Sequence, residues 1–205
     1  PCATEGWCAT ACPVKSDTGK LLTTLRTEEI GDNQKSAVWI ADRMAGTTVA
    51  VCTALSTFGF FHSILGTRMM KSISGGMRKL SGNRIPLWNE FMPLGAKKIA
   101  TNLSIKSAKK VVYFPSCINR TMGVSKEQSH EKQLSEKMLE LLNKGSFEVI
   151  YPEKLNSMCC GMAFSSKGYA DAGQKKSNEL EAALIKASEN GKYPVLCDMS
   201  PCLFT

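Results

Sequence analysis

The chain has 205 residues and a net charge of +8, with 43% apolar and 21% charged residues. This composition is that of a globular protein and excludes a disordered, collagenous or coiled-coil chain, while the length suits one large domain or two small ones. Nine cysteines are too few for a small disulfide-rich scaffold, and an odd number cannot pair completely. Because neighbouring cysteines such as Cys159 and Cys160 seldom bond to each other, the pattern favours reduced thiols that bind a metal.

The N-terminal third is predicted to be helical after a cysteine-rich start. Asp17-Thr18-Gly19 predicts a turn, residues 20–29 a short helix and residues 36–66 a long one. Residues 46–66 contain no charged side chain, and their length would suit a membrane span. The many threonines and serines in this stretch instead favour a helix buried between protein layers.

Residues 68–110 form a segment that we call the basic strip. It holds ten Lys and Arg residues against one acidic residue, Glu90, and so accounts for the whole positive balance. Ser74-Gly75-Gly76 and two prolines predict breaks, which favours a connector. The charge has two interpretations, a solvated linker or a surface that binds anionic lipid or an acidic partner. Nucleic acid is not expected, because the segment has no interleaved aromatic residues and no known reading motif.

Strand and helix patterns alternate from residue 110 onward. Apolar runs and helical spacing predict, in chain order, a strand at 111–114, a helix at 131–143, a strand at 147–151, a helix at 171–190 followed by Gly191, and a strand at 193–197. This order is typical of a parallel sheet with right-handed crossovers.

Each predicted strand of this sheet is followed by cysteine. Cys117 follows the first strand, Cys159 and Cys160 the second, and Cys202 the third. Because the carboxyl ends of parallel strands lie at one edge, we expect the four sulfurs to converge there. Such a site suits an iron–sulfur cluster or zinc, although zinc usually uses C-x2-C pairs, which this half lacks. Gly161 would let backbone N–H groups approach a cluster sulfur.

The N-terminal segment CATEGWCATACP matches a ferredoxin-type cluster motif at all but one position. Cys2, Cys8 and Cys12 follow the spacing C-x2-C-x2-C-x3-C-P, with Glu5 in the place of the second cysteine. Iron–sulfur ligation is the favoured interpretation, with zinc or a disulfide as alternatives. Either Glu5 or another cysteine completes a 4Fe-4S cluster, or the site holds a 3Fe-4S cluster. The remaining cysteines, Cys52 and Cys197, are predicted to be structural.

The segments CATEGWCATACPVKSDTGKL, VVYFPSCINRTMG, MCCGMAFSSKG and PVLCDMSPC resemble the C-terminal iron–sulfur half of FAD-linked, cytochrome-type D-lactate dehydrogenases. The resemblance extends over essentially the whole chain. The second half is also similar to the CCG domain of the glycolate oxidase iron–sulfur subunit and of the heterodisulfide reductase B subunit. The resemblance implies an FAD-binding domain earlier in the same polypeptide, where a D-2-hydroxy acid reduces the flavin. Electrons would then pass singly through iron–sulfur centres to a cytochrome or quinone.

The resemblance also implies two ligand sets. The ferredoxin-like ligands would be Cys2, Cys8 and Cys12 with Glu5, since an acidic residue there is typical of this subfamily. The CCG ligands would be Cys117, Cys159, Cys160 and Cys202. The reductase pattern ends in C-x2-C, whereas this chain has Thr205 at the last position, which favours a single four-iron cluster over a noncubane double cluster.

We therefore expect a mixed fold: a small α-helical iron–sulfur domain followed by an α/β CCG domain with a parallel sheet. The predicted divisions are residues 1–66 for the cluster motif and helical segment, 67–109 for a basic connector, and 110–205 for a CCG domain truncated at its C-terminus. The chain is interpreted as part of a longer polypeptide.

The expected function is the electron-transfer portion of an oxidoreductase, without an acid–base catalyst of its own. His62 and His130 are expected to be structural or exposed. The expected location is cytoplasmic, with peripheral contact to the inner face of the membrane through the basic strip. Two alternatives remain: a CCG-type disulfide reductase subunit whose cluster binds substrate, and a zinc-stabilised interaction domain.

Overall fold

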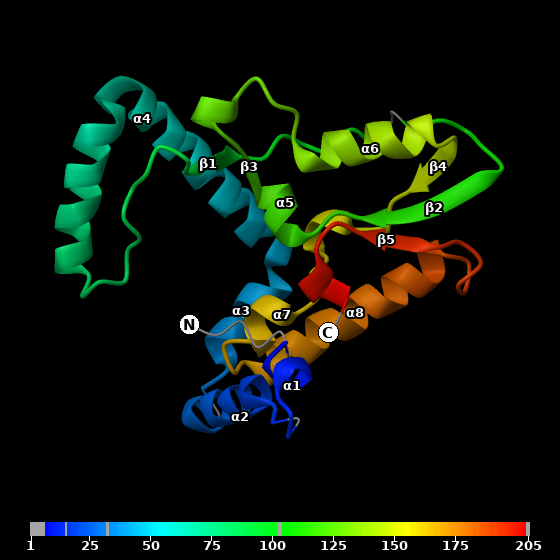
Figure 1. Cartoon of the computed structure of the whole chain (residues 1–205), viewed down its shortest axis with the longest axis horizontal. Coiled ribbons are helices and arrows are strands. Elements are labelled where there is room, and N and C mark those ends of the chain that lie inside the picture. The colour runs from blue at the N-terminus through cyan, green and yellow to red at the C-terminus, as the bar shows by residue number, and fades with distance from the viewer. Residues whose placement is uncertain (1–6, 15, 32, 102–103, 204–205) are drawn as a thin grey trace. The chain divides into compact units, whose positions relative to one another are not determined.

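The computed structural model describes residues 7–14, 16–31, 33–101 and 104–203 (Figure 1). Its fold class is the predicted one, a helical N-terminal region followed by an α/β region with a parallel sheet. Contacts divide the chain into two compact units. The domain boundaries at residues 66 and 109 stay predictions. The first unit contains Pro1–Thr47, Ser104–Cys117 and Leu142–Thr205; the second contains Thr48–Leu103 and Ile118–Leu141.

The sheet of the first unit has three parallel strands in the order β4-β2-β5. Its strands are β2 (Lys109–Phe114), β4 (Phe147–Ile150) and β5 (Val195–Cys197), which lie side by side in Figure 1. The central strand β2 is buried from Val111 to Phe114, as expected for an apolar run between two neighbours. Val112 pairs with Ile150 on one side and Val195 on the other, which fixes the register of all three strands.

Helix α8 (Ala170–Ala187) packs against this sheet. Leu180 is buried in a cluster with Phe114 and Met158, and Leu184 packs on the same cluster. The helix ends at Ser188, after which three consecutive residues with positive φ, ending with Gly191, reverse the chain into β5. The predicted stop at Gly191 thus marks the end of this turn.

Three N-terminal helices belong to the first unit, and two of them, the second and third, pack onto residues 166–175 around the start of α8. They are α1 (Trp7–Ala11), α2 (Thr18–Ile30) and α3 (Lys35–Asp42). The side chain of Asp17 caps α2 by accepting a hydrogen bond from the backbone N–H of Lys20 at 2.9 Å. Ala37, Ala41 and Ala172 form a small buried cluster between α3 and α8. The N-terminal and C-terminal segments therefore share one unit.

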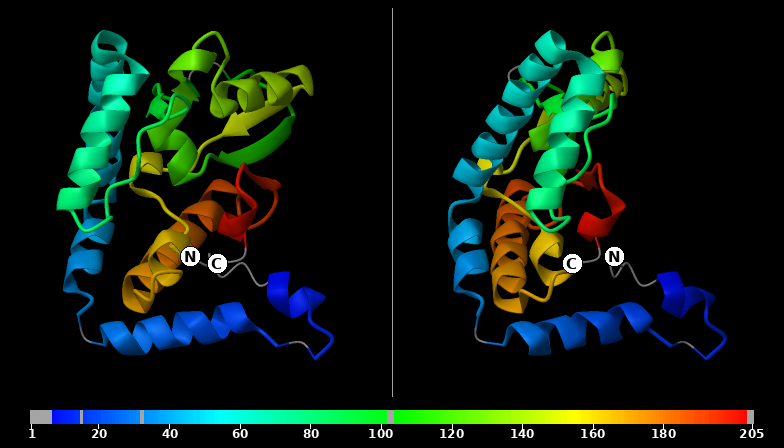
Figure 2. Two further views of the ribbon diagram at one scale, coloured as in Figure 1. Left: turned by 60° about the vertical axis from the view of Figure 1, so that its left-hand side comes forward. Right: turned by 90° about the vertical axis from the view of Figure 1, so that its left-hand side faces the viewer.

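Helix α4 (Met44–Leu80) folds back on itself at Gly66, and Figure 2 shows its two arms. Gly66 has φ 74° and ψ 166°, a conformation that glycine tolerates best. His62 Nε2 lies 2.8 Å from Thr67 Oγ1 across the break, and its ring contacts Trp88 at a centroid distance of 5.4 Å. The break predicted at Ser74-Gly75-Gly76 is wrong, because the second arm continues through these residues.

The prediction that this helix is buried between protein layers is also wrong. Only 11% of its most apolar stretch is buried, and side chains such as Phe60 and Ile64 are about two-thirds exposed. Hydroxyl groups in this helix are satisfied within the helix itself, since those of Thr53 and Thr57 donate to backbone carbonyls four residues earlier. The helix is long and apolar enough to cross a membrane, a weak criterion that core helices of soluble proteins also meet.

The second unit also contains a two-stranded antiparallel sheet of β1 (Pro93–Gly95) and β3 (Met122–Ser125). A Cβ atom on Gly95 would lie 2.3 Å from the carbonyl oxygen of Cys52, so β1 approaches α4 closely. The Cys52 thiol donates to the carbonyl of Ala96 at 3.3 Å, in line with a structural role. The remaining elements are α5 (Cys117–Thr121), η2 (Lys126–Gln128), α6 (Leu134–Lys144), η3 (Leu155–Ser157), α7 (Met162–Ser165) and η4 (Ser200–Leu203).

Close packing at Gly168 predicts a large effect of adding one methyl group. Gly168 has φ +92°, and a Cβ atom there would lie 2.7 Å from the backbone carbon of Arg26. We expect Gly168→Ala to lower the free energy of unfolding by about 2–4 kcal/mol. The control is Gly75→Ala, which has open space in α4 and should raise it by about 0.5–1 kcal/mol. Urea unfolding of both variants checks the prediction, and equal effects would contradict it.

Burial of Tyr151 predicts a specific loss of stability at high pH. Burial raises the pKa of this phenol from 10.0 to about 12, and its hydroxyl has no hydrogen-bond partner among the described residues. Because the folded state favours the protonated phenol, this contribution is complete below pH 10 and is lost as the pH rises through 12. The free energy of unfolding of Tyr151→Phe should therefore fall less steeply than that of the wild type between pH 10 and 12, as measured by urea unfolding at a series of pH values. Identical pH profiles for the variant and the wild type would refute the assignment.

Candidate metal centre

Three connections at the carboxyl edge of the sheet carry the four cysteines predicted to converge. Cys117 begins α5 directly after β2, Cys159 and Cys160 follow η3 after β4, and Cys202 lies in η4 after β5. All four belong to the first compact unit. The parallel topology thus places residues more than 40 positions apart at one edge.

The four thiols form two close pairs joined through adjacent residues. Cys159 Sγ lies 3.8 Å from Cys117 Sγ, and Cys160 Sγ lies 3.2 Å from Cys202 Sγ. These separations exceed the roughly 2.05 Å of a disulfide bond, so none of the four cysteines is in a disulfide. Cys159 also hydrogen-bonds to Cys160, so the sulfurs make one continuous chain. Cys159 and Cys160 are buried, with exposed fractions of 1% and 4%.

The electrostatics of the thiols follow from this crowding. Hydrogen bonds with Cys117 and Cys160, followed by burial, raise the pKa of Cys159. Hydrogen bonds with Cys160 and Cys197, followed by burial, raise the pKa of Cys202. A thiolate here would face other sulfurs in a site of low polarity, so a bound cation would have to stabilise it. Soft sulfur donors without nearby imidazole fit an iron–sulfur cluster or zinc by the chemistry of the donor set.

The same sulfurs do not converge on one point. Among the described residues, no three His, Cys, Asp or Glu side chains are grouped as they would be around a single metal ion. The sulfurs are instead arranged as two pairs along the sheet edge.

Cys197, predicted to be structural, lies at the end of this chain of thiols. It is the last residue of β5 and packs against the same apolar cluster as Cys160 and Cys202. Its pKa is lowered mainly by a hydrogen bond with Cys202. Its own sulfur lies 3.6 Å from the carbonyl oxygen of Met199. The sequence pattern offered no sign of this, because a cysteine inside a strand is usually an ordinary apolar residue.

Gly161 combines a backbone contact to the thiols with a conformation and a close approach that favour glycine. Its N–H donates to Cys159 Sγ at 3.5 Å, the kind of contact expected from the sequence. It also has φ +90°, and a Cβ atom would lie 2.3 Å from the carbonyl oxygen of Gly173 in α8. Gly173 in turn leaves room for Ser165, because a Cβ atom on residue 173 would lie 2.0 Å from Ser165 Oγ. Sequence reasoning missed Gly173, because a glycine within a helical pattern gives no sign of its distant neighbour.

The N-terminal motif is only partly within the described residues. Cys2 and Glu5 lie outside them, and the side chain of Cys8 is not described either. Cys12 follows α1 and is a free, half-buried thiol. Ligation by this motif stays a prediction. Neither histidine joins a thiol site: His62 contacts Thr67, and His130 is exposed.

An apolar groove of about 770 Å³ borders the second thiol pair. It lies between α8 and the segment around β5 and η4, within the first unit. Cys160 and Cys202 contribute to its wall, and Leu180, Leu184 and Leu203 supply much of the apolar surface. The groove therefore reaches the half-buried Cys202, with the buried Cys160 in its wall.

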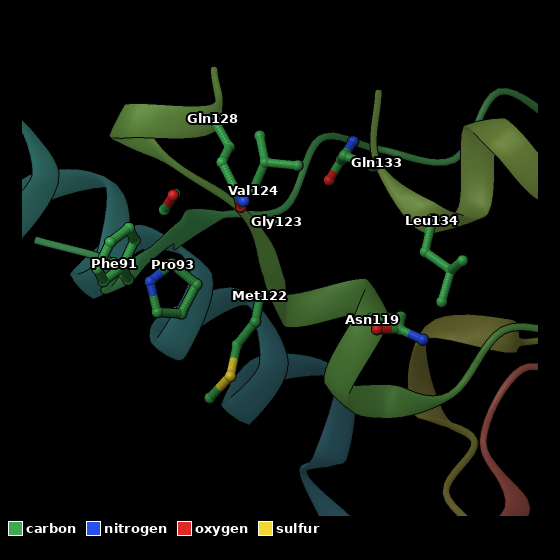
Figure 3. Close-up of a pocket in the computed structure, with 10 residues that line it drawn as sticks. Phe91, Pro93, Asn119, Met122, Gly123, Val124, Gln128, Gln133 and Leu134 are labelled. Atoms are coloured by element: carbon green, nitrogen blue, oxygen red, sulfur yellow. The ribbon is translucent and has the colours of Figure 1, made fainter. Parts of the chain in front are cut away.

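A second, smaller cavity of about 270 Å³ lies in the other unit and is drawn in Figure 3. Apolar residues such as Phe91, Met122 and Leu134 line it together with Gln133. Its lining contains no cysteine, histidine or charged residue. The side-chain Oε1 of Gln133 accepts a hydrogen bond from the backbone N–H of Lys97, which makes this glutamine part of the local scaffold.

Comparison with known proteins identifies the segment that carries the four cysteines. Residues 111–205 match the family model described as CCG: Cysteine-rich domain. No curated protein and no solved structure matches the chain. The matched segment contains most of β2, all of β4 and β5, and the four cysteines at the sheet edge, so the geometry and the family model point to the same part of the chain. Residues 111–205 are therefore similar to CCG-type cysteine-rich domains, which are found in subunits of oxidoreductases.

Proposed function

We propose that this chain is the iron–sulfur electron-transfer portion of an FAD-dependent D-2-hydroxy-acid dehydrogenase acting on D-lactate. Electrons would pass from flavin, bound by another part of the same polypeptide, to a cytochrome or quinone. The observation that carries the proposal is the chain of four sulfurs at one sheet edge of a CCG domain. The resemblance of the N-terminal motif to this dehydrogenase family supports the substrate class.

Cys117, Cys159, Cys160 and Cys202 would hold a 4Fe-4S cluster, which supplies one-electron oxidation and reduction. The side chains of Cys159 and Cys160 are removed from water, and the Gly161 N–H hydrogen-bonds to the Cys159 sulfur. Both features help to set the reduction potential of a cluster.

A second centre would be held by Cys2, Cys8 and Cys12, with Glu5 or another cysteine as the fourth ligand. Support comes from the packing of the N-terminal helices on the CCG domain. Arg26 of α2 hydrogen-bonds to the carbonyl of Ser166, and Lys175 of α8 pairs with Asp42 of α3. Two centres within one compact unit suit a chain of one-electron steps that links a two-electron flavin to a one-electron acceptor.

A CCG-type disulfide reductase is the second candidate. The groove beside Cys160 and Cys202 favours it, because a substrate thiolate would need access to the metal centre. Turnover of a disulfide by the protein without any flavin substrate would support this candidate over the dehydrogenase.

The ligand assignment predicts the iron content of two matched serine variants. Cys160→Ser should lower the iron by about four atoms per chain, because a whole cluster loses a ligand. Cys52→Ser should leave it unchanged, since Cys52 belongs to the other compact unit and its thiol donates to the carbonyl of Ala96. The measurement is iron and acid-labile sulfide, with electron paramagnetic resonance, on anaerobically purified protein that includes its flavin portion. D-lactate should still reduce the flavin in Cys160→Ser.

Two results would contradict the proposed function. Colourless wild-type protein with stoichiometric zinc would show a zinc-stabilised interaction domain. Loss of flavin reduction by D-lactate in Cys160→Ser would show that the cluster is needed before electrons leave the flavin, contrary to the proposal.

The partner of the basic strip is a further part of the proposal: an anionic membrane surface on the cytoplasmic side. Met69, Ile73 and Met77 are exposed and recur every four residues along the second arm of α4. The exposed basic residues Lys71 and Lys79 lie on the same arm. An apolar stripe on a helix that also carries exposed basic side chains is typical of helices that lie in the plane of a membrane surface.

Membrane contact predicts charge-dependent binding to lipid vesicles. Lys71→Gln and Lys79→Gln should each weaken sedimentation with phosphatidylglycerol vesicles about five-fold, since one basic residue contributes about 1 kcal/mol. Lys167→Gln, an exposed lysine in the other unit, is the control and should have no effect. Equal binding of the wild type to neutral phosphatidylcholine vesicles would refute the electrostatic contribution.

A further inference from the structure

Asp198 connects two of the segments that carry the converging cysteines. It follows Cys197 at the end of β5 and lies four residues before Cys202. Its Oδ2 accepts a hydrogen bond from the Tyr113 hydroxyl at 2.9 Å, and its Oδ1 accepts one from the backbone N–H of Ser116 at 2.8 Å. One carboxylate therefore joins the connection after β5 to the connection after β2.

The backbone explains why a side chain is needed at this point. The ladder between β2 and β5 ends with the pair Phe114 and Cys197. The next residue of the first segment is Pro115, which has no N–H to continue the ladder. The N–H of Ser116 is bonded by Asp198 instead. Asp198 thus extends the link between the two segments to the residue directly before Cys117.

The partners of Asp198 are themselves held in place. Tyr113 is completely buried in the central strand, and Ser116 is 1% exposed. Hydrogen bonds to a carboxylate in a buried setting are stronger than those between neutral groups. An amide at this position would offer one acceptor oxygen to two donors, so it could not reproduce both bonds.

The charge of Asp198 has a second consequence. A carboxylate close to a cluster of thiolates opposes the addition of an electron through Coulomb repulsion. The reduction potential of an iron–sulfur cluster depends on the net charge and hydrogen bonding around it.

We propose that Asp198 is a positioning residue of the CCG-domain centre: it holds the Cys117 segment against the Cys202 segment, and its negative charge lowers the reduction potential. This inference rests on the proposed iron–sulfur function. Asp198 binds no metal; it acts through the two segments that it joins.

The test compares three variants of the full polypeptide, including its flavin portion, under anaerobic conditions. Asp198→Asn removes the charge and one hydrogen bond. Tyr113→Phe removes one hydrogen bond and keeps the charge. Asp198→Glu keeps the charge and both acceptor oxygens with a longer reach. The readouts are iron per chain, the electron paramagnetic resonance spectrum, and the reduction potential from a titration monitored by that spectrum.

We expect Asp198→Asn to shift the potential of the CCG-domain centre to more positive values and to change its spectrum. Tyr113→Phe should change the spectrum without that positive shift, and Asp198→Glu should keep the potential closer to the wild type. In metal-free protein, Asp198→Asn should also make Cys117 react faster with iodoacetamide, because the segment is released. The flavin potential should be the same in every variant.

The outcomes separate the two proposals. If Asp198→Asn has the same iron content, reduction potential and spectrum as the wild type, the role of Asp198 is overturned and the iron–sulfur function stands. A wild-type protein without iron would overturn the iron–sulfur function itself. If Asp198→Asn does not fold, an unchanged spectrum in both Tyr113→Phe and Asp198→Glu would equally overturn the inference.

Discussion

Parallel pairing of β2 with β4 and β5 is the constraint on which the thiol site depends. Each pair of contacting sulfurs joins residues 42 positions apart, a distance that no local turn could close. The register between Val112 and its two partners fixes where each strand ends. A shift of one residue would turn alternate side chains to the other face of the sheet and would separate the sulfurs. The buried central strand holds this register.

Thiols gathered in this way favour their protonated forms. Hydrogen bonds between neighbouring sulfurs, followed by burial, raise the pKa of Cys159 and of Cys202 and so oppose the formation of thiolates. Apolar packing around Phe114 and the close contact between Gly161 and Gly173 hold the site together. Metal binding would reverse this preference, because a bound cation favours deprotonated thiols.

The sequence predicted the features that depend on local pattern. The apolar run of β2 and the helical spacing of α8 gave the parallel sheet, and topology alone placed Cys117, Cys159, Cys160 and Cys202 at one edge. Long-range contacts were not predictable. Gly66, and not Gly75-Gly76, breaks α4, and its neighbours His62 and Trp88 meet only in the folded chain. Asp198 and Gly173 likewise gave no local signal, since their partners lie far away in the sequence.

The packing of α2 and α3 on the far end of the chain has a consequence for synthesis on the ribosome. Arg26 meets its partner 140 residues later, and Asp42 meets Lys175 133 residues later. At roughly 5–20 residues per second, about 7 to 30 seconds pass before the docking surface for the first helices emerges. During this interval α2 and α3 lie outside the ribosome without the segment on which they pack. The nascent chain therefore has a period in which a chaperone could bind the uncovered faces of these helices before the later segment covers them.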